Sequence, residues 1–99
     1  MSFARIGLFD VPPHQLASVV ALFQDRITPA FAGHAGFLGY QAFIDESEGR
    51  YVGISYWITL TALEGSAVTA GRARQEAETL GAKILGDPII TREAFNTRA

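Results

Sequence analysis

The sequence predicts an α+β fold in which a four-stranded antiparallel sheet carries both helices on one face. Three observations support this prediction. Apolar and amphipathic segments follow one another in the order β-α-β-β-α-β, a short polar turn joins the two middle strands, and no repeat or linker interrupts the order. The 99 residues fit one domain, 1–99, and a chain of this length buries about 60–70% of its unfolded surface.

The first strand is predicted at residues 3–9, and residues 10–13 close it. The two prolines at the end of this closing segment fix φ and lack a backbone donor, which suits the entry to a helix. Apolar residues at helical spacing then predict an amphipathic helix over about residues 13–32: Leu16, Val19, Val20, Phe23, Ile27 and Phe31. Pro29 is expected to kink this helix or to end it early.

Two apolar strands, residues 36–44 and 50–60, flank the polar turn 45–49 and form a predicted hairpin. Both strands are apolar on both faces, whereas an antiparallel hairpin usually has one polar face. Either register is compatible with the sequence, because a change of one residue in the loop exchanges the two faces. The two helices cover one face only, so we expect the other face to pack on a second copy in a homodimer.

The second half of the chain predicts a short helix, a long helix and a last strand. Residues 61–64 fit a capping box, residues 65–66 break the short helix, and the long helix is expected to end at Gly86, before Pro88. Its apolar face consists of Ala70, Ala73, Ala77, Leu80 and Ile84. The last strand is predicted at residues 89–95, which completes the split βαβ or ferredoxin-like plan.

Composition excludes several classes of function. A net charge of −2 without a basic run argues against nucleic-acid binding, and the absence of cysteine excludes disulfides and thiolate ligands. The N-terminus lacks a signal-peptide pattern and no apolar segment reaches membrane-spanning length, so we expect a cytoplasmic protein without membrane partners. The carboxylates in the turn 45–49 fit a solvated turn, and no metal-ligand spacing or phosphate loop occurs, so neither a metal nor another cofactor is expected.

The runs 34–43 and 50–57, with residues 61–64, resemble the antibiotic biosynthesis monooxygenase family of dimeric α+β barrels. The similarity extends over residues 3–95. The resemblance implies a homodimer with a pocket in each subunit, between helices and sheet, with Trp57 on its wall. Members of the family include cofactor-free oxygenases of quinol-like substrates, haem-degrading enzymes and proteins without a known role.

The family resemblance carries over to only part of the expected site. The similar aromatic-polyketide oxygenases have an asparagine four residues before the tryptophan, where this chain has Gly53. They also use an arginine on the following helix, for which Arg72 and Arg74 are the candidates. The haem-degrading branch needs an asparagine in the first strand, which is absent here, and a histidine where this chain has Ala67. Haem degradation is therefore disfavoured.

The candidate residues form two groups, each with a structural alternative. The catalytic candidates are Trp57, His34, Arg72 and Arg74; the substrate-binding candidates are Phe23, Phe37, Phe43, Tyr51 and Leu80. In the structural alternative, Trp57 and the other aromatic residues pack in the core, and His34 is a loop histidine without a functional role. The arginines would alternatively form solvated i,i+4 pairs with Glu76 and Glu78.

Two functions are consistent with these residues and with the family resemblance. The first is a cofactor-independent monooxygenase acting on a small aromatic or quinol-type substrate, whose anion reduces dioxygen while the protein orients the ring and stabilises the oxyanion. The alternative is a homodimer of the same fold that binds a small apolar or aromatic ligand without catalysis, or that has a structural role only.

Overall fold

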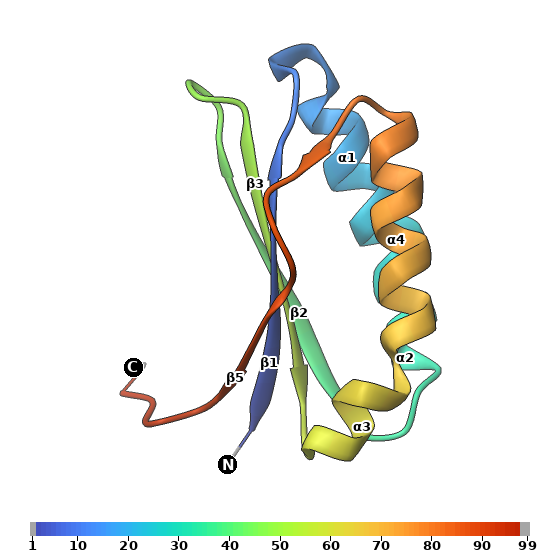
Figure 1. The fold of residues 1–99 in the computed structure, drawn as a ribbon, viewed down its shortest axis with the longest axis vertical. Helices are drawn as coiled ribbons and strands as arrows, with labels where there is room; N and C mark the ends of the chain where they lie inside the picture. The colour runs from blue at the N-terminus through green and yellow to red at the C-terminus, as the bar shows by residue number, and fades with distance from the viewer. Residues whose placement is uncertain (1, 98–99) are drawn as a thin grey trace.

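The computed structural model describes residues 2–97 and has two layers, a sheet and a layer of helices (Figure 1). The strands are β1 (Phe3–Asp10), β2 (Phe37–Asp45), β3 (Arg50–Trp57), β4 (Lys83–Ile84) and β5 (Ile89–Arg92). Their order is β2-β3-β1-β4, with β5 also paired to β1, and every pair is antiparallel. The predicted α+β ferredoxin-like fold is confirmed, with β1 and β3 at its centre.

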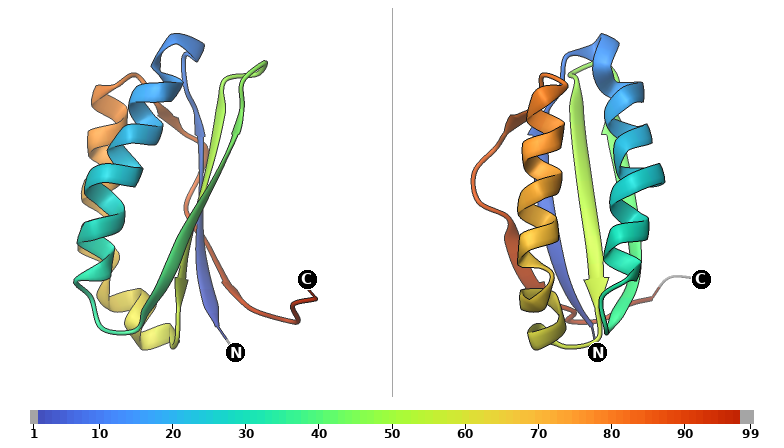
Figure 2. Two further views of the ribbon diagram at one scale, coloured as in Figure 1. Left: turned by 180° about the vertical axis from the view of Figure 1, so that it is seen from behind. Right: turned by 90° about the vertical axis from the view of Figure 1, so that its right-hand side faces the viewer.

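The helices are η1 (Pro13–Gln15), α1 (Leu16–Leu22), η2 (Phe23–Ile27), α2 (Thr28–Ala32), α3 (Leu60–Gly65) and α4 (Ala67–Thr79). Figure 2 shows the segment from α1 to α2 and helix α4 side by side on one face of the sheet. Within residues 2–97, no helix combines the length and the apolar character that crossing a membrane requires.

Pro29 does not end the first helical segment early, because the chain continues as helix to the end of α2. The turn before it, η2, is a π-helix, in which the Thr28 N–H donates to the Phe23 carbonyl five residues back. A proline cannot donate to the carbonyl four residues back and its ring crowds that carbonyl. The wider π turn accommodates the proline without breaking the helix.

The N-cap of helix α3 lies two residues before the start of the predicted capping box. Its N-cap is Thr59, whose hydroxyl accepts a hydrogen bond from the Ala62 N–H over 3.0 Å. The capping box at residues 61–64 is therefore wrong, since both ends of that motif lie inside the helix. The predicted break at residues 65–66 is confirmed, because α3 ends at Gly65 and Ser66 separates it from α4.

Helix α4 ends at Thr79 instead of Gly86. Gly81 has a φ of +89°, and the N–H groups of Gly81 and Ala82 donate to the carbonyls of Glu78 and Ala77. This pattern is a Schellman motif, which needs a left-handed residue and so favours the first available glycine. The chain then forms β4, so Ile84 belongs to a strand and not to the helix. The last strand is also shorter than predicted and ends at Arg92.

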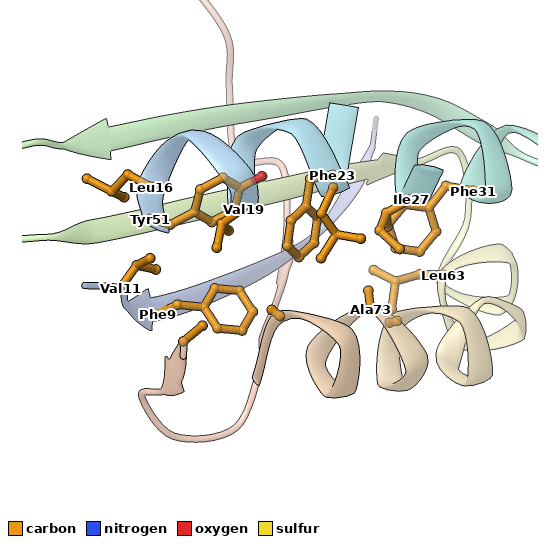
Figure 3. Packing of buried hydrophobic residues seen from close by; sticks show 14 of the residues in the cluster. Phe9, Val11, Leu16, Val19, Phe23, Ile27, Phe31, Tyr51, Leu63 and Ala73 are labelled. Carbon is orange, nitrogen blue, oxygen red and sulfur yellow. The ribbon is translucent and has the colours of Figure 1, made fainter. Parts of the chain in front are cut away.

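The hydrophobic core fills the space between the two layers. Alternate residues of β3 are buried against the helices: Tyr51, Gly53, Ser55 and Trp57. Phe23 stacks on Tyr51 with ring centroids 4.9 Å apart, and Phe9 lies 5.9 Å from Phe23. Figure 3 shows these rings together between the helices and the central strands. The structure therefore selects the register in which this face of the hairpin points to the helices.

The opposite face of the sheet carries no helix (Figure 2, left). The register places a continuous set of mostly apolar side chains there: Ile6, Leu8, Phe43, Val52, Ile54, Tyr56 and Ile89. Phe43 and Ile89 are about half exposed, at 52% and 48%. We call this set the open face. Its apolar character agrees with the sequence prediction that the hairpin is apolar on both faces.

Candidate functional site

A small cavity lies where the two central strands lack side chains. Gly7 of β1 pairs with Gly53 of β3, and both positions face the helices. Helix α4 presents the small residues Ala70 and Ala73 to the same space. The resulting cavity, which we call the slot, has a volume of about 40 Å³, enough for two or three water-sized groups. Aromatic rings and a proline form its apolar walls: Phe9, Phe23, Phe31, Tyr40 and Pro88.

Two arginines border the slot, Arg5 from β1 and Arg74 from α4. The Arg5 guanidinium is buried and donates to the Ser66 hydroxyl over 2.9 Å and to the Leu63 carbonyl over 2.7 Å. Burial, with the nearby Arg74 charge, lowers the pKa of Arg5. Neither guanidinium forms an ion pair with a carboxylate within residues 2–97. The slot is therefore bordered by two guanidiniums and by no carboxylate.

The structure separates the two arginine candidates on α4. Arg74 is half-buried beside the slot, whereas Arg72 is exposed. The i,i+4 pairs expected for these arginines do not form. Glu76 instead pairs with Arg26 from the first helical segment, with 3.1 Å between Nη2 and Oε1.

A pair of tyrosines fills the space above Gly53. The hydroxyls of Tyr40 and Tyr51 are 2.9 Å apart and share a hydrogen bond. A side chain at position 53 would collide with the Tyr40 hydroxyl, so the glycine is required by this close approach. Burial raises the pKa of Tyr40 well above its usual range and that of Tyr51 to about 12. Both hydroxyls are therefore protonated at neutral pH, and neither can act as a base.

Trp57 is fully buried behind the slot. Its indole Nε1 donates to the Ser55 hydroxyl over 2.9 Å, and Ser55 borders the slot directly. The edges of the Phe31 and Phe37 rings meet Trp57 with centroids 5.7 and 5.3 Å apart. Trp57 thus packs in the core and also contacts the slot through Ser55.

Apart from Arg74 of α4, the polar residues of the slot come from three strands in one row. Arg5 pairs with Ser55 across β1 and β3, and Ser55 pairs with Tyr40 across β3 and β2. Directly opposed residues on antiparallel strands point to the same face, so this row faces the helices. Arg5 and Ser55 were not among the sequence candidates. The isolated charge of Arg5 in an otherwise apolar strand is the signal that could have identified it.

Among the other sequence candidates, only Phe23 borders the slot. Tyr51 lies behind Tyr40, Phe37 packs on Trp57, and Leu80 packs on the core near the end of α4. Phe43 projects from the open face, so its assignment to a pocket between helices and sheet is wrong. The alternation of side chains along β2 explains this, because residue 43 is opposite Val52.

His34 lies in a different depression from the arginines. Its Nε2 is 2.8 Å from the Thr69 hydroxyl, and its ring meets the edge of Trp57 at 6.3 Å. The depression around His34 is formed by the connector before β2 and by residues of α3, including Ala62 and Gly65. The geometry therefore groups His34 with the helix junction and not with the slot.

The slot offers cations and hydroxyl groups and no free carboxylate or imidazole among the residues that border it. Such a set can bind and stabilise an anion, but it provides no general base at neutral pH. No group of three or more histidine or acidic side chains suited to a metal ion occurs in residues 2–97.

Comparison with known proteins agrees with this architecture. The family model described as antibiotic biosynthesis monooxygenase matches residues 2–71. No curated protein matches the chain significantly.

Three solved structures illustrate the similarity of fold. A putative antibiotic biosynthesis monooxygenase from Deinococcus radiodurans has a TM-score of 0.72 and 22% identity, covering 100% of both chains. SnoaB from Streptomyces nogalater, a cofactor-independent oxygenase, has a TM-score of 0.68 and 18% identity, covering 96% of this chain and 95% of its own. MupZ from Pseudomonas fluorescens has a TM-score of 0.69 and 17% identity, with 85% of this chain covered. The chain spans 62% of the length of MupZ. At these identities the likeness concerns the fold alone.

Proposed function

We propose that this chain, which belongs to the antibiotic biosynthesis monooxygenase family, is a cofactor-independent monooxygenase acting on a small aromatic or quinol-type substrate. The observation that carries the proposal is the slot itself. It combines a floor without side chains, aromatic walls and two guanidiniums that have no carboxylate partner within residues 2–97. SnoaB, a protein of the same fold, is a cofactor-independent oxygenase, which supports the same class of chemistry.

The proposed reaction uses the electrons of the substrate. An electron-rich hydroxylated ring loses a proton, and its anion transfers an electron to dioxygen. The substrate radical and superoxide then combine through a carbon–oxygen bond, and protonation gives a hydroperoxide. Loss of water from this hydroperoxide leaves one oxygen atom of dioxygen in the product. The substrate is oxidised, dioxygen is reduced, and one oxygen atom leaves as water.

Within this scheme the protein binds the ionised substrate and keeps water out. Arg74, with Arg5 behind it, would stabilise the oxyanion and lower the pKa of the bound hydroxyl, since a cation favours the charged form. Solvent would accept the proton, because the slot has no base. A ring is larger than the 40 Å³ slot, so it would enter by displacing the Arg74 side chain. That side chain has no hydrogen bond within the described residues.

We also propose that the protein is a homodimer in which the open face packs on its partner, and that it is cytoplasmic. An uncovered set of seven mostly apolar side chains supports the dimer, because exposed apolar patches of this kind mark interaction sites. The absence of cysteine supports a reducing compartment.

A second candidate function is the binding of a small aromatic ligand without turnover. The lack of a general base among the residues that border the slot favours it, because such residues can bind an anion without removing a proton from it. Gly53 favours it too, since the polar side chain of the similar oxygenases is absent there.

Oxygen uptake distinguishes the two functions. Metal-free and flavin-free protein is mixed with a panel of quinols and polycyclic phenols, and dioxygen consumption is followed with an electrode against the protein-free background. An oxygenase gives a rate that increases with pH as the substrate ionises. A panel without turnover above the spontaneous rate contradicts the oxygenase and favours the binding protein.

A further inference from the structure

We infer that Tyr40 and Ser55 determine the specificity of the slot, because every polar side chain that faces it presents a hydrogen-bond donor. The slot then favours a ligand edge that carries acceptors, as an aromatic oxyanion does, over one that presents N–H donors, as an aromatic amine does. This inference rests on the proposed use of the slot as the ligand site, but it does not require turnover.

The direction of the tyrosine hydrogen bond follows from burial. Tyr51 is fully buried, and its hydroxyl has no acceptor within residues 2–97 other than the Tyr40 oxygen. If Tyr40 donated to Tyr51, the Tyr51 proton would be buried without a partner, which is costly. Tyr51 therefore donates to Tyr40. The Tyr40 proton is then free to point into the slot, which Tyr40 borders.

Ser55 is fixed in the same way. Its oxygen accepts the indole N–H of Trp57, a group that can only donate. Its hydroxyl proton has no acceptor within the described residues, and Ser55 also borders the slot. The buried donors Tyr51 and Trp57 thus each occupy an acceptor position of a hydroxyl, and both hydroxyl protons stay available to a ligand in the same cavity.

The arginines complete the set. A guanidinium donates and never accepts, and Arg5 uses only two of its five N–H groups on Ser66 and Leu63. Tyr40 also occupies the space that a side chain at Gly53 would need.

The test measures binding without dioxygen, so that turnover does not interfere. Calorimetry under nitrogen compares 1-naphthol with 1-aminonaphthalene, which has the same ring but presents N–H donors. The absorbance of 1-naphthol reports the pKa of the bound hydroxyl. We expect the ionised naphthol to bind at least about tenfold more tightly than the amine, and its pKa to decrease on binding.

Conservative variants identify the donors. Tyr40→Phe keeps the ring and removes the proton, and it should weaken naphtholate binding by about tenfold without affecting the amine. Ser55→Ala should have a similar effect. Tyr56→Phe is the matched control, because the Tyr56 hydroxyl donates to Gln41 on the open face, away from the slot. Thermal melting of each variant verifies that it is folded.

Three results would overturn the inference: no binding of 1-naphtholate to the native protein, equal affinity for the amine, or unchanged naphtholate affinity in both Tyr40→Phe and Ser55→Ala. Failure of the oxygenase proposal would give a different set of results. Absent oxygen uptake together with donor-dependent naphtholate binding would reject catalysis and support the specificity. Oxygen uptake that is unchanged in the Tyr40 and Ser55 variants would support catalysis and reject the specificity.

Discussion

Trp57 and Ser55, two residues apart on β3, are joined by a hydrogen bond of 2.9 Å from the indole Nε1 to the serine Oγ. Both side chains point to the helices, and both are almost completely buried, at 0% and 2% exposure. The bond satisfies the buried indole N–H, and it also fixes the orientation of a hydroxyl that borders the slot. One interaction therefore serves both the core and the candidate site.

Trp57→Phe should destabilise the protein by about 2–4 kcal/mol, because it leaves a cavity and removes a buried hydrogen bond. It should also reduce turnover while the dimer persists, since the open face is untouched. Urea unfolding measures the change in stability, oxygen uptake the turnover, and sedimentation the dimer. Combined with Ser55→Ala, a double-mutant cycle should give a coupling of about 1 kcal/mol. Strict additivity of the two changes would contradict the role of the hydrogen bond.

The two arginines of α4 form a matched pair for testing the oxyanion site. Arg74→Gln removes the charge beside the slot and should lower turnover by roughly 10²-fold. Arg72→Gln removes an equal charge from the exposed side of the same helix and should change the rate by less than about twofold. Steady-state oxygen uptake at a fixed pH measures both. Equal effects of the two variants would mean that charge on the helix acts only at long range.

The fold was predictable because its signals are local. Helical spacing over residues 13–32 and the polar turn at 45–49 each lie within one segment, and both elements exist as predicted. The end of α4 was predicted wrongly because Gly81 and Gly86 both provide glycine with positive φ. After Gly81 the chain pairs with β1 as strand β4, and this pairing favours the earlier end of the helix. The spacing of residues in the sequence does not reveal that pairing.

The site was less predictable because it depends on strand register. Tyr40, Ser55 and Arg5 belong to three strands and meet only in the observed pairing. A shift of one residue in the pairing of any one of these strands would send its member of the row to the open face. Phe23 was found because it lies on a helical face with a clear periodicity, and Arg74 was found because the family resemblance implies an arginine on this helix. Phe43 was misassigned because an apolar residue suits either face of a two-sided apolar strand.

The open face predicts association. Ile54→Asp puts a charge at its centre, opposite Ile6 and Gln41, and should prevent dimer formation and impair folding. Val68→Asp, on the exposed side of α4 at 75% exposure, is the matched control and should have little effect. Sedimentation at micromolar concentration and circular dichroism are the measurements. A native protein that sediments as a monomer would refute the dimer directly.

The buried tyrosine pair predicts a loss of stability at high pH. Burial raises the pKa of Tyr51 from 10.0 to about 12, and burial raises the pKa of Tyr40 as well. Below about pH 10 both states keep these protons, so the pair makes no pH-dependent contribution. Between about pH 10 and 12 the unfolded chain loses protons that the folded protein retains, and the free energy of unfolding decreases as pH rises. The expected slope is about 1.4 kcal/mol per pH unit for each tyrosine.

Urea unfolding at intervals from about pH 8 to pH 12 measures this slope. The double variant Tyr40→Phe/Tyr51→Phe lacks both groups, so its stability should decrease less steeply over the same range, by up to about 3 kcal/mol per pH unit. Tyr51→Phe alone should remove about half of that difference. Comparison with the native protein cancels the contribution of lysine and arginine, which also titrate at high pH. Identical slopes in the native protein and the double variant would show that the pair does not retain its protons in the folded state.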